Sequence, residues 1–174
     1  MSGNGYTTTM SAAGVAETIG AARRVVVTTH AKPDGDAVGS VLACVRLVQR
    51  LGGGREAEGW FAGPFPSWLG TVAGATPIRK LGESTASVGR PWDDADLVLV
   101  VDTGSWSQVE PVKAWLSARV DRTLIIDHHL HGSPDLAENI SSISTRIRRS
   151  CATSLPCPPT TPSAAAGALA WSLN

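Results

Sequence analysis

The chain has 174 residues, of which 43% are hydrophobic, and this is enough for one domain with a single core. Fifteen basic and fifteen acidic side chains balance, which excludes the broad cationic surface that binds long nucleic acids but leaves a small anionic substrate open. No apolar run approaches the roughly 20 residues that span a bilayer, and the amino terminus does not resemble a secretory signal, so we expect a cytoplasmic protein. The cysteines Cys44, Cys151 and Cys157 have no CxxC spacing, and neither a disulfide framework nor a zinc site follows.

The spacing of apolar residues predicts alternating helices and strands. The predicted elements are a helix over 12–22, a strand over 24–29, a helix over 37–51, a strand over 55–61, a strand over 96–102, a helix over 107–119 and a strand over 123–126. Ser107 and Glu110 have the spacing of a capping box for the last helix, and Pro111 suits its first turn. The sequence over 62–91 predicts loops with short helices or strands.

The strand segments are continuous apolar runs, which is typical of strands buried on both faces of a sheet. Because these strands alternate with helices, the sequence predicts an α/β fold in which a parallel, Rossmann-like sheet is flanked by helices. We expect this domain to cover residues 12–138. Residues 139–174 are rich in Ser, Thr, Pro, Arg and Ala, contain no Asp, Glu or His, and predict an irregular or disordered tail, with a short helix over 163–173 as an alternative.

Polar residues stand at the end of three predicted strands. His30, Asp34 and Asp36 follow the first, Asp102 ends a later one, and Asp127-His128-His129 ends the third. The carboxyl ends of parallel strands meet at one edge, where open α/β sheets bind ligands. We therefore expect these side chains to share one rim.

Each of these residues also has a structural interpretation. Asp34 or Asp36 suits a turn or a helix cap, and Asp102 suits the end of a strand. Lys32 and His131 are interpreted as solvated loop residues. Several carboxylates and imidazoles on one rim would nevertheless repel one another or stay unpaired without a cation, so together they favour a metal site.

Carboxylate and imidazole ligands without a thiolate favour manganese, magnesium or iron over structural zinc, and manganese suits the mixture best. Asp34 and Asp36 flank Gly35, so their carboxylates can diverge toward two ions, and Asp102 is the natural bridge between them. Sites with two metals cleave phosphate esters. Trp106 could stack on a base, although packing within its loop is the better interpretation.

These motifs resemble the DHH phosphoesterase superfamily, which includes the longer RecJ-like exonucleases. Residues 30–40, HAKPDGDAVGS, follow the family pattern H-x-x-P-D-x-D-A-x-G-S, and Asp127-His128-His129 supplies the tripeptide that names it. The glycine between the two aspartates is more similar to small oligoribonucleases and phosphoadenosine-phosphate phosphatases than to manganese pyrophosphatases. The resemblance implies a Rossmann-like DHH domain.

The resemblance also implies a role for each residue. His30 and Asp34 would hold one Mn²⁺, Asp36 and His128 the other, and Asp102 would bridge both, with Mg²⁺ as an alternative ion.

Asp127 would orient the histidines, and His129 would contact the substrate phosphate or donate a proton, or else only pack beneath the rim. With Asp102, His129 is the candidate catalytic residue.

The function implied by the resemblance is a manganese-dependent phosphoesterase that hydrolyses short oligoribonucleotides or nucleotide phosphates, such as phosphoadenosine phosphate and linear dinucleotides, and a homodimer is compatible with it. The alternative is a truncated, catalytically inactive DHH domain that binds metal or nucleotide without turnover. A nicotinamide-binding protein would need a GxGxxG motif after the first strand, and none is present.

Beyond about residue 132 the sequence departs from the family pattern. The family continues with a further metal-binding aspartate and a C-terminal domain that grips the substrate, whereas Asp135, the only later aspartate, is too close to the DHH tripeptide to match. We therefore expect an N-terminal fragment and hypothesise that residues from about 139 are read in a shifted frame. A naturally short protein with a disordered tail is the other interpretation.

Overall fold

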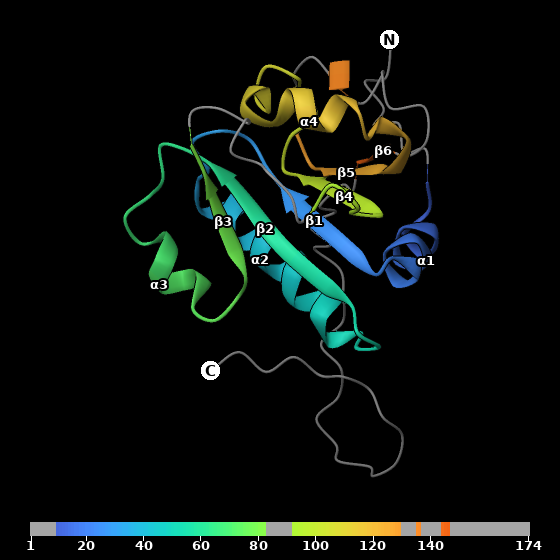
Figure 1. Cartoon of the computed structure of the whole chain (residues 1–174). Coiled ribbons are helices and arrows are strands. Elements are labelled where there is room, and N and C mark those ends of the chain that lie inside the picture. Colours follow the sequence, from blue (N-terminus) through green and yellow to red (C-terminus); the bar gives the residue numbers. More distant parts are fainter. Residues whose placement is uncertain (1–9, 83–91, 130–134, 137–143, 147–174) are drawn as a thin grey trace, which may run out of the picture.

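Six parallel strands form one sheet at the centre of the computed structural model (Figure 1). The structure describes residues 10–82, 92–129, 135, 136 and 144–146. The strands are β1 (Arg24–Thr28), β2 (Glu56–Ala62), β3 (Ile78–Leu81), β4 (Leu97–Val101), β5 (Thr123–Asp127) and β6 (Ser144–Arg146), and their order in the sheet is β3-β2-β1-β4-β5-β6. Every pairing is parallel, so the predicted parallel α/β sheet is confirmed.

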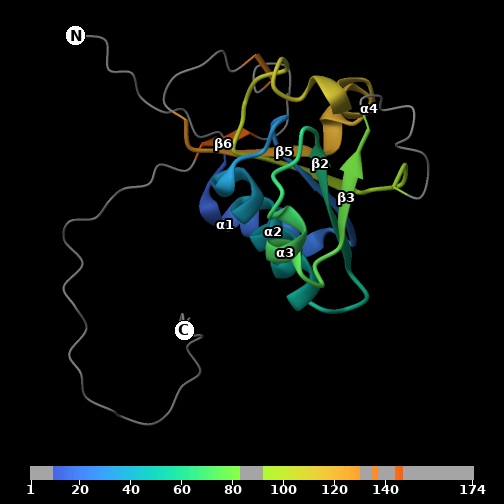
Figure 2. The same cartoon turned by 90° about the vertical axis from the view of Figure 1, so that its left-hand side faces the viewer.

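Helices cover both faces of the sheet, as the two views in Figures 1 and 2 show. One face carries α1 (Ala12–Ala21), α2 (Gly35–Arg50) and α3 (Leu69–Ala73), and the other carries α4 (Lys113–Ser117). In β1, Val25 and Val27 pack toward α2 while Val26 packs toward α4, and all three are fully buried. Burial on both faces explains why this strand is apolar throughout rather than alternating.

The predicted helix over 107–119 is only partly present. A 3-10 turn, η2 (Glu110–Val112), leads into α4, and a second turn, η3 (Val120–Arg122), follows it. The proposed capping box is wrong, because the hydroxyl of Ser107 lies 2.9 Å from that of Ser105, and Val109, which precedes η2, makes no side-chain cap. Without a cap, the short segment is held by burial of Val112 and Leu116 against β4 and β5.

The predicted tail contains one element that the sequence did not indicate. Residues 144–146 form β6, which pairs in parallel with β5. Every other residue from 139 onward, including the alternative helix over 163–173, lies outside the described residues. None of the described helices has the length and apolar character needed to cross a membrane. Cys44 lies on α2, and burial raises the pKa of its thiol to about 11.

The order of the strands puts the topological switch point of the sheet between β1 and β4. The chain runs outward from β1 to β2 and β3, and then returns to the other side of β1 to form β4. This reversal is the topological switch point of the sheet, and ligands of open α/β sheets bind beyond the carboxyl ends of the strands at such a point.

Candidate metal centre

A backbone hydrogen bond joins the loops after β1 and β4 across the switch point. The backbone N–H of Ala31 donates to the carbonyl oxygen of Gln108 at 2.8 Å, and the N–H of Lys32 donates to the carbonyl oxygen of Ala62 at 3.3 Å. His30 is therefore held between the loop that follows β4 and the end of β2. Lys32 is exposed and has a left-handed φ of 57°, a conformation that is uncommon for residues other than glycine.

Asp34 begins α2 and lies on the rim at the same time. One of its carboxylate oxygens, Oδ1, accepts hydrogen bonds from the backbone N–H groups of Asp36 at 3.1 Å and Ala37 at 3.0 Å. The bond from Ala37 is the main reason why the pKa of the Asp34 carboxyl is lowered, so the side chain is a carboxylate at neutral pH. The expected helix cap is thus present, and Asp34 also lies within ligand range of His30 and Asp102.

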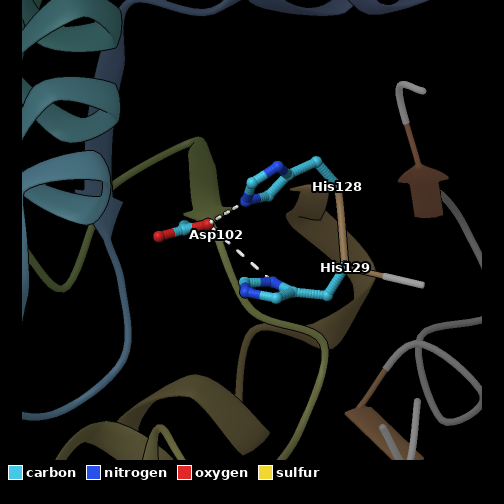
Figure 3. Close-up of side chains that lie close together, drawn as sticks. All are labelled: Asp102, His128 and His129. Carbon is cyan, nitrogen blue, oxygen red and sulfur yellow. Dashed lines mark ion pairs between the residues drawn. The ribbon is translucent and has the colours of Figure 1, made fainter. Parts of the chain in front are cut away.

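Asp102 is at the centre of the site (Figure 3). It follows β4 in a left-handed conformation with φ 63°, and its N–H donates to the carbonyl oxygen of Ile126, which extends the pairing of β4 with β5. Oδ1 lies 2.9 Å from Nε2 of His128 and 3.8 Å from Nδ1 of His129, and Oδ2 lies 3.7 Å from Nε2 of His30. Burial raises the pKa of the Asp102 carboxyl.

The Nε2 atom of His30 faces the carboxylate of Asp102. Its Nδ1 lies 2.9 Å from the carbonyl oxygen of Ala31, which can only accept, so the proton of the neutral imidazole is on Nδ1. Nε2 then carries a lone pair and faces Oδ2 of Asp102 at 3.7 Å, which is too long for a hydrogen bond. Two electron-pair donors that face each other in this way fit a cation between them.

A second group of donors lies on the other side of Asp102. His128 Nε2 is 3.4 Å from Oδ2 of Asp36 in addition to its contact with Asp102. Residues within ligand range of one another form two sets that share Asp102, namely His30, Asp34 and Asp102, and Asp102, His128 and His129. The structure therefore brings all five predicted metal-binding residues to one rim. All donors are oxygen or imidazole nitrogen, and this set fits Mn²⁺ or Mg²⁺.

Asp127 and His129 form a hydrogen-bonded pair beside these donors. Nδ1 of His129 lies 2.7 Å from Oδ1 of Asp127, and the backbone N–H of His129 donates to the same oxygen at 3.3 Å. Asp127 is buried, whereas the His129 side chain is half exposed. The bond to Asp127 is the main reason why the pKa of His129 is raised. Because Nδ1 is engaged, Nε2 is the nitrogen with which His129 can meet a substrate.

Two other residues singled out in the sequence have structural roles. Trp106 is partly buried against the core on the α4 side, which agrees with packing rather than stacking on a base. Its backbone N–H donates to Oδ1 of Asp135 at 3.0 Å, and the neighbouring Leu136 is fully buried with its N–H bonded to the carbonyl oxygen of Gly104. Asp135 thus anchors the chain that follows the histidines to the loop after β4. His131 lies outside the described residues.

Two hollows in the described part of the surface lie away from this rim. One of about 650 Å³ runs along the outer side of α2 past Arg46, Leu47 and Arg50, and one of about 500 Å³ lies at the amino edge beside Arg24 and Trp92. Neither contains a cluster of metal-binding side chains. The chemistry of the donors, rather than the size of a hollow, therefore identifies the rim as the candidate site.

Comparison with known proteins agrees with this geometry. Residues 24–167 match the family described as the DHH family, N-terminal domain. The chain belongs to the DHH family. The match contains all three motif segments of the rim, and it continues past Glu138 into the segment that the sequence set apart as a tail.

A solved structure shows the same fold as this DHH domain. It is described as an exopolyphosphatase-related protein from Bacteroides fragilis, with a TM-score of 0.61 and 20% sequence identity. The similarity covers 80% of this chain and 40% of that one, so the chain spans less than half the length of the protein it resembles. Among curated proteins, none matches this chain significantly.

Asp34 caps α2 and is also a proposed metal ligand, and two substitutions separate these roles. Asn caps helices as well as Asp does but is a poor ligand for a divalent cation, whereas Ala does neither. Without metal, Asp34→Asn should melt close to the native protein and Asp34→Ala should lose about 1 kcal/mol of unfolding free energy. With Mn²⁺ in large excess, binding at one site adds about 2.7 kcal/mol at a hundred times Kd, and both variants should lose most of the gain from the ion that Asp34 holds.

Thermal unfolding with and without Mn²⁺ measures both effects in one series. If Asp34→Asn keeps the full rise in melting temperature on addition of Mn²⁺, Asp34 is only a cap.

Proposed function

We propose that this DHH domain is a manganese-dependent phosphoesterase with two metal ions. His30 and Asp34 would hold one ion, Asp36 and His128 the other, and Asp102 would bridge them. The observation that supports this most is the position of the Asp102 carboxylate, which is buried between Nε2 of His128 at 2.9 Å and Nε2 of His30 at 3.7 Å. A single carboxylate that faces two groups of donors suits a bridging ligand.

When bound, divalent ions supply activation of water and electrostatic stabilisation of the phosphoryl oxygens. Contacts within the chain orient the side chains that would bind these ions. Ala31 fixes the proton of His30 on Nδ1, so that Nε2 stays a donor, and the cap of α2 keeps Asp34 ionised. The hydrogen bond from Ala31 to Gln108 fixes the loop after β1 against the loop after β4.

His129 is the residue that we propose to contact the phosphate or to donate the proton to the leaving oxygen. Its bond to buried Asp127 fixes the ring and places the proton of Nδ1, so that Nε2 is the atom available to a substrate. The half-exposed side chain can reach a ligand beside the rim, which a residue packed beneath it could not.

The substrates that we propose are short oligoribonucleotides or nucleotide phosphates, including phosphoadenosine phosphate and linear dinucleotides. They follow from the HAKPDGD motif and its likeness to small oligoribonucleases and phosphoadenosine-phosphate phosphatases. The exopolyphosphatase-related structure adds polyphosphate as a further anionic candidate. A cytoplasmic location and a homodimer agree with this function and are part of the proposal.

Hydrolysis of 5′-phosphorylated diadenylate and triadenylate, phosphoadenosine phosphate and polyphosphate by the full chain tests the proposal. Product formation should require added Mn²⁺, stop with a chelator and be weaker with Mg²⁺. Activity that is independent of any divalent ion would contradict the two-metal site.

The second candidate is a domain that binds metal or nucleotide without turnover. The half-exposed donor pair of Asp36 and His128 favours it, because this side of the site is more open to water than the buried side of Asp102. Calorimetry with Mn²⁺ distinguishes the two. Saturable binding of Mn²⁺ with no hydrolysis of any of the four substrates would assign this chain to the second class.

A further inference from the structure

Charges are distributed unevenly along the carboxyl edge of the sheet. The ends of β1, β4 and β5 carry the carboxylates and imidazoles of the candidate metal centre. Residues 59–82, which run from the middle of β2 to the end of β3, contain no Asp, Glu or His and have two cations, Arg79 and Lys80. Glu58 precedes this segment and Glu83 follows it. An anion that extends from the metal centre toward β3 would therefore meet no carboxylate from this segment.

The two cations of β3 have different surroundings, because successive residues of a strand point to opposite faces. Arg79 is paired with Glu58 at 2.9 Å, and its charge is already balanced. Lys80 lies in register with Phe61, which packs in the core on the α2 side, so Lys80 is on the face of the sheet that carries α2.

Lys80 is exposed, and its ammonium group lies over an aromatic ring. The Nζ atom lies 5.5 Å from the ring centroid of Phe65, in the loop that follows β2, and Phe65 packs against the core. Gly63 leaves room for this ring, since a Cβ there would lie 3.3 Å from it. No carboxylate in the described parts of the chain pairs with Lys80.

Lys32 is in the loop that joins β1 to α2, among the proposed metal ligands. It is two residues from His30 and from Asp34, it is exposed, and its N–H is bonded to Ala62 at the end of β2. Among the described residues other than glycine, Lys32 and Asp102 alone have positive φ, and both are on the rim. Strained backbone of this kind concentrates at ligand-binding sites.

We propose that Lys32 and Lys80 bind a second phosphate group of the substrate, next to the phosphate that occupies the metal centre. The inference rests on the proposed phosphoesterase function and assigns the second phosphate group of the proposed substrates to two residues of this chain. Metal ions would neutralise the phosphate at the centre, whereas the next phosphate lies beyond them and needs cations from the protein. Adjacent strands are about 4.8 Å apart, so Lys80 on β3 lies about 10 Å across the sheet from β1, with Lys32 closer.

Binding of two labelled ligands to the full chain tests this site without requiring turnover. The ligands are fluorescein-labelled triadenylate with phosphorothioate linkages and fluorescein-labelled adenosine monophosphate, and fluorescence anisotropy is measured with Mn²⁺ present. The variants are Lys32→Asn, Lys80→Gln and the double variant. Asn adopts left-handed backbone readily, so the first variant removes charge with little change in strain. The matched control is Arg23→Gln, which removes an exposed charge at the amino end of β1.

We expect each lysine variant to weaken binding of triadenylate by roughly threefold to tenfold, and the double variant to multiply these effects. Binding of the monophosphate should change less than about twofold, because it has no second phosphate. The dependence of log K on log salt should become shallower by about 0.7 per lysine for triadenylate. Arg23→Gln should change neither affinity.

Three outcomes would overturn the inference. These are an unchanged affinity for triadenylate in the double variant, an equal loss for both ligands, and no binding of triadenylate by the native chain. Lys80→Arg keeps the charge and should bind as the native chain does, which excludes a general effect of substitution. If the predicted losses occur but no substrate is hydrolysed, the phosphate site stands and the proposed catalytic function fails.

Discussion

Asp102→Asn is expected to abolish metal-dependent hydrolysis, with a loss of at least about 10³-fold in kcat/KM. The carboxylate is the one group that faces both sets of donors, through His128 on one side and His30 on the other. Asn keeps the shape of the side chain and tolerates the left-handed φ of 63°, so the loss would come from the missing charge and not from a changed backbone. Steady-state hydrolysis of diadenylate over a range of Mn²⁺ concentrations measures it.

The same variant should be more stable than the native protein when no metal is present. Burial raises the pKa of the Asp102 carboxyl, so ionisation at neutral pH costs folding free energy, and Asn does not incur this cost. Because the pKa in the folded protein is above the usual value, the native protein gains stability as the pH falls through that pKa. The advantage of the variant should therefore be largest at neutral pH and disappear in acid.

Asp96→Asn is the matched control, because Asp96 immediately precedes β4 and Asp102 immediately follows it. Asp96 accepts hydrogen bonds from the backbone of Arg23 and Arg24 at the opposite edge of the sheet, so its substitution should leave hydrolysis unchanged. Asp102→Asn with native activity, or with a lower melting temperature than the native protein in chelator, would contradict this account of the site.

Asp127→Asn is expected to lower kcat by roughly 10-fold to 100-fold while the rise in melting temperature with Mn²⁺ stays close to native. Asp127 touches His129 through Oδ1, at 2.7 Å from Nδ1. Asn can present its NH₂ group to this nitrogen, which would move the imidazole proton to Nε2 and reverse the tautomer that a substrate meets. The effect should therefore appear in turnover and not in metal binding.

A double-mutant cycle with His129→Gln tests whether Asp127 acts through His129. If it does, the double variant should be no slower than His129→Gln alone, because the orienting group has nothing left to orient. If the two losses multiply, Asp127 has a separate role. An unchanged kcat in both single variants would show that His129 only packs beneath the rim.

The sheet could be predicted because its signals are local. The runs that form β1 and β4 are apolar along their whole length, and burial on both faces follows from that property alone. By contrast, the predicted helix over 107–119 is replaced by a 3-10 turn and a short helix. The hydroxyl of Ser107 has an alternative partner in Ser105, and a local pattern cannot show which partner is chosen. The pairing of β6 with β5 could not be predicted either, because β6 consists of three polar residues and has no apolar run.

The sequence also indicated which residues share the rim. Parallel strands end at one edge, so the polar residues that follow the apolar runs must lie near one another. This argument does not require any tertiary contact to be known. The family match over residues 24–167 agrees with the motifs on which that argument rested. The roles of the five predicted ligands remain a proposal that the variants above test.

By itself, then, the sequence determined the parallel α/β architecture, the edge at which His30, Asp34, Asp36, Asp102 and the DHH tripeptide gather, and the family. The tertiary structure decided the rest. It placed the proton of His30 through Ala31, and it set which atoms of Asp102, Asp127 and the histidines face each other. It also set the left-handed backbone of Lys32 and the position of Lys80 over Phe65. The contacts of Lys32 with Ala62 and of Lys80 with Phe65 join segments that are separate along the chain. The bonds of His30 to Ala31 and of Asp127 to His129 are local, but they depend on the orientation of a side chain, which no hydrophobic period predicts.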